Sequence, residues 1–245
     1  MLRKYITVFN NWQVPLFVWF GIFKIKYILF YLRNGYVMLG EKWDVAPIVE
    51  NFYDKDYELG NFVELQEGDT VVDIGANIGS FSLYAMKKAG KIFAYEPAPV
   101  SFWLLETNVK MNNALNIKLF RKAVTREEGS ITLGISKEGS SGNSSYIKSE
   151  TNVVVPATNL KAIMEENGIK KIDFLKVDCE GAEYDIILTT PPAIYKKIKK
   201  IALEYHKITE EHRPEELIEV LLKNGFEVRK IEKNDSVGIL YGRKI

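Results

Sequence analysis

From residue 70 onward, short apolar runs alternate along the chain with longer stretches of helical character. Residues 70–74 (TVVDI) and 91–95 (KIFAY) have the length and composition of buried strands. Between them, residues 80–88 are predicted to form a helix that closes at Gly90. This order of strand, helix and strand is typical of a parallel sheet covered by helices.

The alternation continues to residue 205 with one interruption. Further helices are expected at 98–112, at 158–168 with Thr158 as its cap, and at 180–189, and further strands at 117–122, 171–177 and 200–205. After residue 122, turn signals at Gly129, Gly134, Gly139 and Gly142 predict an irregular insertion. Its Gly/Ser-rich part, residues 137–150, is expected to be either a flexible loop or a mobile lid.

The end of the chain predicts an antiparallel hairpin. A helix over 214–225 is followed by strands at 227–232 and 237–241, and only a short turn separates these two strands. A parallel pair needs a crossover of about a dozen residues or more, so one of the two strands runs against the others. The expected fold is therefore α/β, with a Rossmann-like, mostly parallel sheet of seven strands and a reversed final strand.

The first 60 residues form a separate pattern, and we divide the chain into an apolar helical or hairpin extension (1–60) and a main domain (61–245). Residues 14–23 are uncharged, but lysines interrupt the apolar stretch before it reaches the roughly 20 residues that a membrane span needs. No signal-peptide cleavage site follows. Two interpretations remain, a helix packed on the main domain or a helix lying on a membrane surface. The second would place four aromatic residues in the interface: Trp12, Trp19, Phe20 and Phe23.

Composition and charge narrow the partners. The 245 residues are 47% hydrophobic and 27% charged, as in an ordinary globular protein, and the net charge of +1 gives no reason to expect nucleic-acid binding. A single cysteine, Cys179, allows no intrachain disulfide and no cysteine-based zinc site. We therefore expect a cytoplasmic protein, with membrane association as the alternative for the extension.

The most specific motif is VVDIGANIGSF at residues 71–81. Gly75 permits a tight turn after the strand, and Gly79 lets the next helix pack closely. The dinucleotide fingerprint G-x-G-x-x-G is not met, because Asn77 stands where the second glycine belongs. The amide of Asn77 and the carboxylate of Asp73 suit a zwitterionic amino-acid group, such as the one that S-adenosylmethionine carries.

The second strand ends in Tyr95-Glu96-Pro97. An acidic residue at this place is positioned to accept both hydroxyls of a ribose. Glu96 would serve S-adenosylmethionine or NAD equally, so it indicates a nucleoside without choosing between them.

Together these motifs resemble the FkbM family of class I S-adenosylmethionine-dependent methyltransferases. The resemblance rests on VVDIGANIG at 71–79, YEP at 95–97, KVDCEGAE at 176–183 and EYH at 204–206. It implies methylation of an oxygen, commonly a hydroxyl of a sugar, polyketide or other small metabolite. It also implies a set of cofactor-binding residues: Asp73, Gly75, Ala76, Asn77 and Gly79 for the methionine part, and Glu96 with Pro97 for the ribose.

Methylating a hydroxyl requires a base near the methyl group, and ligands of open α/β sheets bind at the carboxyl ends of strands. Asp178 and Glu180 follow the fourth strand, and Glu204 and His206 end the fifth. We take His206 as the candidate base because its ordinary pKa is nearest neutrality, with Asp178 and Glu180 as further catalytic candidates. A His206 that is merely hydrogen-bonded at the strand end is the alternative.

Other assignments stay open. Asp178, Glu180 and Glu204 could also hold a divalent cation such as Mg²⁺, although their spacing does not require one. A nucleoside-binding protein without activity, or an NAD-dependent oxidoreductase, would share part of the pattern. Cys179 is expected to be a packed thiol rather than a nucleophile.

Overall fold

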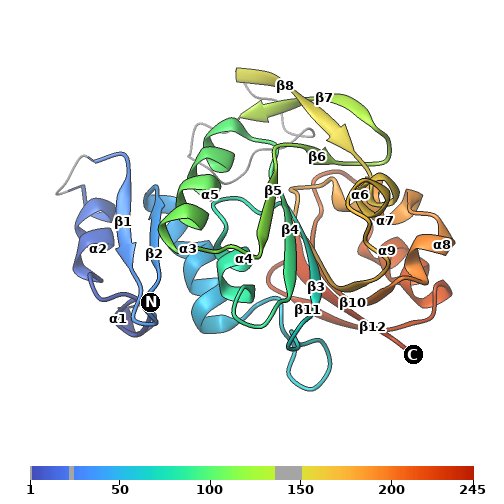
Figure 1. Ribbon diagram of the computed structural model, residues 1–245, viewed down its shortest axis with the longest axis horizontal. Helices are drawn as coiled ribbons and strands as arrows, with labels where there is room; N and C mark the ends of the chain where they lie inside the picture. The colour runs from blue at the N-terminus through green and yellow to red at the C-terminus, as the bar shows by residue number, and fades with distance from the viewer. Residues whose placement is uncertain (1, 22–24, 136–150) are drawn as a thin grey trace.

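The computed structural model describes residues 2–21, 25–135 and 151–245 (Figure 1). At its centre is a seven-stranded sheet with the order β11-β12-β10-β9-β3-β4-β5. The strands are β3 (Thr70–Ile74), β4 (Lys91–Tyr95), β5 (Ile117–Phe120), β9 (Ile172–Val177), β10 (Ile198–His206), β11 (Phe226–Glu232) and β12 (Val237–Lys244). β12 pairs antiparallel with both β10 and β11, and the other neighbouring pairs are parallel. The predicted sheet with a reversed final strand is confirmed.

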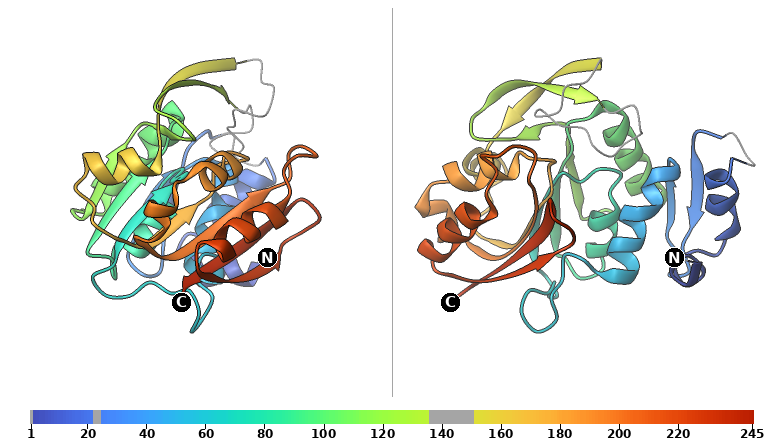
Figure 2. Two further views of the ribbon diagram at one scale, coloured as in Figure 1. Left: turned by 90° about the vertical axis from the view of Figure 1, so that its right-hand side faces the viewer. Right: turned by 180° about the vertical axis from the view of Figure 1, so that it is seen from behind.

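Helices cover both faces of the sheet (Figure 2). They are α4 (Ser80–Ala85), α5 (Pro99–Met111), α6 (Leu160–Glu166), α7 (Glu183–Thr189), α8 (Pro192–Tyr195) and α9 (Pro214–Lys223). Buried residues of α4 and α5 belong to one hydrophobic cluster, and those of α6 to α9 belong to another. Because successive strand residues point to opposite faces, Val71 of β3 joins the first cluster and Val72 the second.

Two helix starts differ from the prediction. Asn159 caps α6, because its Oδ1 accepts the backbone N–H of Ala162 at 3.0 Å, whereas Thr158 is the last residue of β8. Helix α7 begins at Glu183 instead of residue 180 because Glu180 and Gly181 have φ values of 52° and 105°, outside the helical range. The short helix α8 was not predicted.

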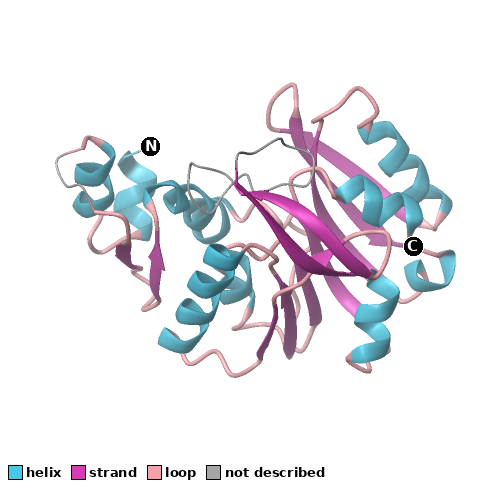
Figure 3. Cartoon of the chain, turned by 90° about the horizontal axis from the view of Figure 1, so that it is seen from above, coloured by secondary structure: helices cyan, strands magenta, loops and turns pink. Residues whose placement is uncertain are grey.

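The predicted irregular insertion is partly wrong. Its described residues form a second sheet of order β6-β8-β7, built from β6 (Ala123–Val124), β7 (Gly129–Ile135) and β8 (Thr151–Thr158). Leu133 and Val155 are buried against Ala98 and Ala123, which explains why the alternating apolar residues outweigh the glycines. Figure 3 shows this sheet lying across the central one. The predicted loop 137–150 lies outside the described residues.

The N-terminal region forms a lobe at one end of the long axis (Figure 1). It contains α1 (Leu2–Val8), α2 (Gln13–Trp19) and the hairpin of β1 (Ile28–Tyr31) and β2 (Val37–Gly40). η1 (Lys42–Asp44), α3 (Val45–Val49) and the π-helical turn η2 (Glu50–Asp54) then lead to the main sheet. The expected apolar helix is thus interrupted, and throughout the described chain the helices are too short or too polar to cross a bilayer.

One side of this lobe packs on the main domain. Val8, Phe9 and Val18 are buried in the cluster that also holds residues of α4 and α5. The side-chain amide of Asn108 in α5 accepts the backbone N–H of Leu39 and donates to its carbonyl. The amide of Asn112 makes the same two bonds with Val37, so β2 is fixed against α5. Phe23 and the side chain of Trp19 lie outside what the structure describes. The division at residue 60 stays a prediction.

Candidate active site

The loop between β3 and α4 is folded tightly under the carboxyl ends of the strands. Gly75 has φ of 74°, and a Cβ on it would lie 1.6 Å from the carbonyl oxygen of Asp178, so no other residue fits. The backbone N–H groups of Gly75 and Ala76 donate to the carbonyl of Tyr95 at 3.0 and 2.9 Å. The loop is therefore tied to the ends of β4 and β9 together.

Glu96 lies at the end of β4 and faces this loop. Its Oε2 accepts the N–H of Asn77 at 2.9 Å, and its Oε1 accepts the N–H of Ala98 at 2.9 Å. Burial raises the pKa of Glu96 to about 7, although both backbone bonds and the charge of Lys176 oppose the increase. Pro97, next in the chain, is half-buried.

Asn77 presents a buried amide oxygen at the same place. Its backbone is left-handed, with φ of 51°, and its Oδ1 has no hydrogen-bond partner among the described residues. A buried acceptor without a partner is costly unless a ligand supplies a donor. Asn77 and Glu96 therefore form a pair of acceptors that suits a bound polar ligand.

Asp73, which the motif predicts to bind the methionine part of the cofactor, is enclosed by neighbouring side chains. It is fully buried, and its Oδ2 accepts the hydroxyl of Ser82 at 2.6 Å. Its Oδ1 lies 3.2 Å from Nζ of Lys176, which also donates to the carbonyl of Gly75 at 2.6 Å. Burial lowers the pKa of Lys176, but the charges of Asp73 and Asp178 outweigh it and raise the pKa. Lys176 therefore links the β3–α4 loop to Asp73 in the preceding strand.

Tyr57 connects the carboxyl ends of β9 and β10. Its hydroxyl lies 2.8 Å from Oδ2 of Asp178 and 3.2 Å from Oε2 of Glu204, and its single proton is shared between them. Lys233, in the hairpin turn, bridges Glu204 at 3.1 Å and Asp56 at 2.8 Å. Residues from the N-terminal region and the terminal hairpin thus complete the polar cluster at the strand ends.

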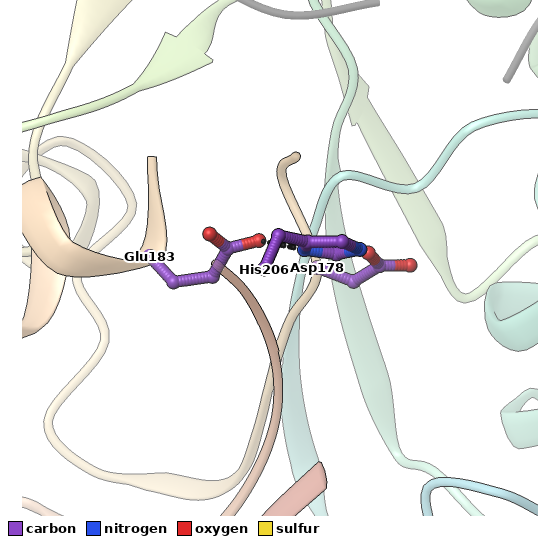
Figure 4. Close-up of side chains that lie close together, drawn as sticks. All are labelled: Asp178, Glu183 and His206. Carbon is purple, nitrogen blue, oxygen red and sulfur yellow. Dashed lines mark hydrogen bonds and ion pairs between the residues drawn. The ribbon is translucent and has the colours of Figure 1, made fainter. Parts of the chain in front are cut away.

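His206, at the end of β10, forms an ion pair with Glu183 (Figure 4). The Nδ1 of His206 lies 2.9 Å from Oε1 of Glu183, and its Nε2 lies 3.8 Å from Oε2 of Glu180. Glu183 is fully buried and also accepts the backbone N–H groups of Cys179 and Gly181 at 2.9 and 2.7 Å. It therefore holds the turn between β9 and α7 in place.

The electrostatics of this pair decide its proton state. Burial lowers the pKa of His206, but the hydrogen bond and charge of Glu183, with the charges of Asp178 and Glu180, raise it to about 10. At neutral pH the imidazole is then positively charged. A charged imidazolium donates protons and accepts none, so the ring carries no free base function in this arrangement.

Asp178 and Glu50 respond in opposite ways to the same surroundings. Burial raises the pKa of Asp178, but the charges of Lys176 and His206 outweigh it and hold the pKa below its ordinary value. For Glu50, burial raises the pKa to about 7, helped by the charges of Glu204, Asp56 and Asp178 and opposed by that of Lys233. No described residue hydrogen-bonds or pairs with the Glu50 carboxylate.

Three side chains of this cluster lie close enough together to hold a cation. One ligand atom each of Asp178, Glu183 and His206 lies within 4.8 Å of the others. However, Glu183 already accepts two backbone N–H groups and the imidazole, and a protonated imidazole has no lone pair to offer. The cation site suggested for Asp178, Glu180 and Glu204 is not supported either. Each of these carboxylates already has a cationic neighbour, which is Lys176, His206 and Lys233 respectively.

The structure brings most of the predicted site residues to one edge of the sheet. Gly75, Ala76, Asn77 and Gly79 form the β3–α4 loop, and Glu96 and Pro97 follow β4 next to it. Asp178 and Glu180 lie in the turn after β9, and His206 ends β10. The sequence analysis did not identify Glu50, Tyr57, Lys176 and Lys233 as site residues. Lys176 had a detectable signal, since it is a charged residue inside an otherwise apolar strand.

Burial raises the pKa of the Cys179 thiol well above its ordinary value, and the negative charges of Glu183 and Asp178 add to the effect. A protonated, partly buried thiol is a poor nucleophile. This agrees with the expectation that Cys179 is a packed thiol.

Most of the residues that form this site fall in a segment that matches a known protein family. A model of the methyltransferase FkbM domain matches residues 73–228. Methyltransferase sdnD of Sordaria araneosa is 29% identical over 190 residues, which is 63% of this chain and 72% of that protein. The 31-O-demethyl-FK506 methyltransferase FkbM of Streptomyces tacrolimicus is 27% identical over 212 residues, or 73% and 80% of the two chains.

Among solved structures, methyltransferase FkbM of Methylobacillus flagellatus shares the fold with a TM-score of 0.52 at 14% identity. That match covers 82% of this chain and 54% of the other. The matched family segment contains the β3–α4 loop, Glu96, the β9–α7 turn and the end of β10.

Proposed function

We propose, since the chain belongs to the FkbM methyltransferase family, that it transfers a methyl group from S-adenosylmethionine to a hydroxyl oxygen of a small molecule or glycan. The observation that carries the proposal is the carboxylate-rich edge of the sheet, where Tyr57 bonds both Asp178 and Glu204. Glu50 interacts electrostatically with both of these carboxylates and with Lys233. The name of the Streptomyces relative describes methyl transfer to an oxygen, which supports the same reaction here.

The residues present fit the donor. The buried Oδ1 of Asn77 is an acceptor without a partner and suits an ammonium group. Each oxygen of Glu96 accepts one backbone N–H and keeps capacity for a ribose hydroxyl. When bound, S-adenosylmethionine supplies an activated methyl group on a sulfonium. In this proposal Gly75, Ala76, Gly79 and Pro97 shape the pocket, and Asp73 positions the loop without touching the ligand.

The proton of the acceptor hydroxyl must be removed during transfer, and we assign this step to Glu50. A carboxylate with a pKa of about 7 is matched to proton transfer at neutral pH. His206 instead stays protonated through Glu183, so we propose that its charge, with Asp178 and Glu180, orients the acceptor and keeps the local charge balanced. The base role that the sequence suggested for His206 thus moves to a residue of the N-terminal region.

The test is methyl transfer with isotopically labelled S-adenosylmethionine and a panel of sugars and hydroxylated small molecules. Each acceptor is paired with a version in which one hydroxyl is replaced by hydrogen, and product is read by mass spectrometry. The proposal expects a labelled methyl ether that disappears with the deoxy partner. A methyl group found on nitrogen or carbon would contradict it.

Variants test the assignment of the base. Glu50→Gln should lower kcat by about 100-fold or more while S-adenosylhomocysteine still binds, because only proton removal is affected. Glu67→Gln, at an exposed carboxylate outside the cluster, serves as the matched control and should leave kcat unchanged. Unchanged kcat in Glu50→Gln would reject Glu50 as the base without rejecting O-methylation.

A further inference from the structure

The first 40 residues have an unusual composition. They contain five basic residues and no Asp or Glu, and they hold 11 of the 30 aromatic residues of the chain. The remainder of the chain carries the whole acidic content, so this lobe is positive although the protein is almost neutral. Such a segment favours a negatively charged partner.

The apolar residues of the lobe are partly buried in its packing and partly exposed to solvent. Phe9, Phe30 and Met38 are fully buried in the hydrophobic cluster that the lobe shares with α4 and α5. Other apolar side chains are open to solvent: the structure describes 17 exposed large hydrophobic residues, and seven of them fall within residues 2–31. These seven are Leu2, Ile6, Phe17, Phe20, Ile25, Leu29 and Tyr31. A single exposed apolar residue needs no explanation, but this concentration does.

Cations accompany the exposed apolar residues. Arg3, Lys26 and Arg33 are exposed on the same lobe. Lys4 is balanced by Asp54 at 2.5 Å, and Lys26 is only weakly paired, at 3.8 Å from Glu41. The lobe therefore combines large apolar side chains with a net positive charge.

We propose that this lobe, residues 2–40, docks on the surface of an anionic lipid bilayer. Leu2, Phe20 and Ile25 would enter the interfacial region, with Arg3 and Lys26 at the level of the headgroup phosphates. The lobe contacts the bilayer from one side without crossing it.

Two other partners fit these observations less well. Nucleic acid would match the charge, but it would leave aliphatic side chains such as Leu2 and Ile25 without an apolar environment. A second copy of the chain would cover the apolar residues, but a symmetric contact would bring the two positive lobes together. A bilayer with negative headgroups satisfies both the charge and the apolar surface.

The experiment is sedimentation of the full chain with two kinds of vesicle, one of phosphatidylcholine alone and one of equal parts phosphatidylcholine and phosphatidylglycerol. The protein should bind the second kind more tightly, and added salt should weaken this binding because it screens the charges. Arg3→Gln and Lys26→Gln should each weaken binding to the anionic vesicles about fivefold. A protein that does not sediment with the anionic vesicles would overturn the proposal.

A matched pair of apolar variants tests the contact itself. Leu2→Ser with Phe20→Ser should weaken binding about tenfold or more, because Leu2 is 50% and Phe20 74% exposed on the lobe. Leu222→Ser, at a residue 54% exposed on α9, should leave binding unchanged. S-adenosylhomocysteine affinity and far-UV circular dichroism are measured for each variant to show that the fold is intact.

Two outcomes would assign the surface differently. If Leu222→Ser weakened vesicle binding as much as the lobe variant, docking would not reside on the lobe. If the protein formed a dimer that the Leu2 and Phe20 substitutions separated, and did not bind vesicles, the face would belong to a second copy. Both results would contradict the proposal, and neither would affect the methyltransferase assignment.

Discussion

Replacing Lys176 by Met removes a buried cation that bonds the β3–α4 loop at the carbonyl of Gly75. Lys176 is 3% exposed, and its Nζ lies 3.2 Å from Oδ1 of Asp73, which is fully buried. Methionine keeps much of the side-chain volume but not the charge. The substitution therefore leaves the Asp73 carboxylate in an apolar interior without the charge that faces it.

The expected loss follows from this burial. Breaking a buried ion pair by removing one partner costs about 3–5 kcal/mol of unfolding free energy. For a chain of this size each kcal/mol lowers the melting temperature by about 2–4 °C, so the midpoint should fall by roughly 6–20 °C. Urea unfolding followed by circular dichroism measures the free energy directly.

A second variant separates the charge from the packing. In Lys176→Met with Asp73→Asn neither member of the pair carries a charge, and the amide oxygen can still accept the hydroxyl of Ser82. The double variant should therefore recover a large part of the lost free energy. The reasoning is refuted if Lys176→Met stays within about 1 kcal/mol of the wild type, or if Asp73→Asn adds a further loss.

Three further predictions concern the loop and the strand ends. Gly75→Ala should abolish S-adenosylhomocysteine binding in a titration, because its Cβ would lie 1.6 Å from the Asp178 carbonyl oxygen; wild-type affinity would show that this approach is not as close. Because the pKa of Glu96 is raised to about 7, S-adenosylhomocysteine affinity should increase from about pH 6 to about pH 8 as the carboxylate ionises, and Glu96→Gln should remove this dependence; a flat wild-type profile would contradict it. Because the pKa of His206 is raised to about 10, its pairing with Glu183 stabilises the fold fully below the ordinary pKa of 6.5 and loses this effect as pH rises through 10. Urea unfolding at several pH values should show the gap between wild type and His206→Gln narrowing from pH 7 to 10; a constant gap would contradict the assignment.

The sheet was predictable because its strands are short, apolar and bounded by clear signals. Residues 70–74 and 91–95 appear as strands at the predicted positions, and the short turn after residue 232 correctly required an antiparallel pair. The β6-β8-β7 sheet was not predicted because the glycines in 129–135 indicate turns, although the apolar residues between them alternate as in a strand. Local turn signals and side-chain alternation conflicted there, and tertiary packing decided the outcome.

The candidate site was predictable only where it follows the chain. Asn77 and Glu96 adjoin strand ends, so their neighbourhood could be inferred from topology. Tyr57 and Glu50 come from the N-terminal region, and their approach to Asp178 depends on long-range packing that no spacing encodes. The proton state of His206 depends likewise on Glu183, whose reach across the β9–α7 turn becomes visible only in three dimensions.

The most direct test of the central claim is a calorimetric titration of the protein with S-adenosylmethionine, S-adenosylhomocysteine and NADH. The same titration with Glu96→Ala shows whether the proposed ribose contact matters, and Glu67→Ala at an exposed carboxylate is the control. We predict saturable binding of the two sulfur nucleosides, weakened in Glu96→Ala and unchanged in Glu67→Ala. Binding of NADH alone, or no binding of either sulfur nucleoside, would contradict the account.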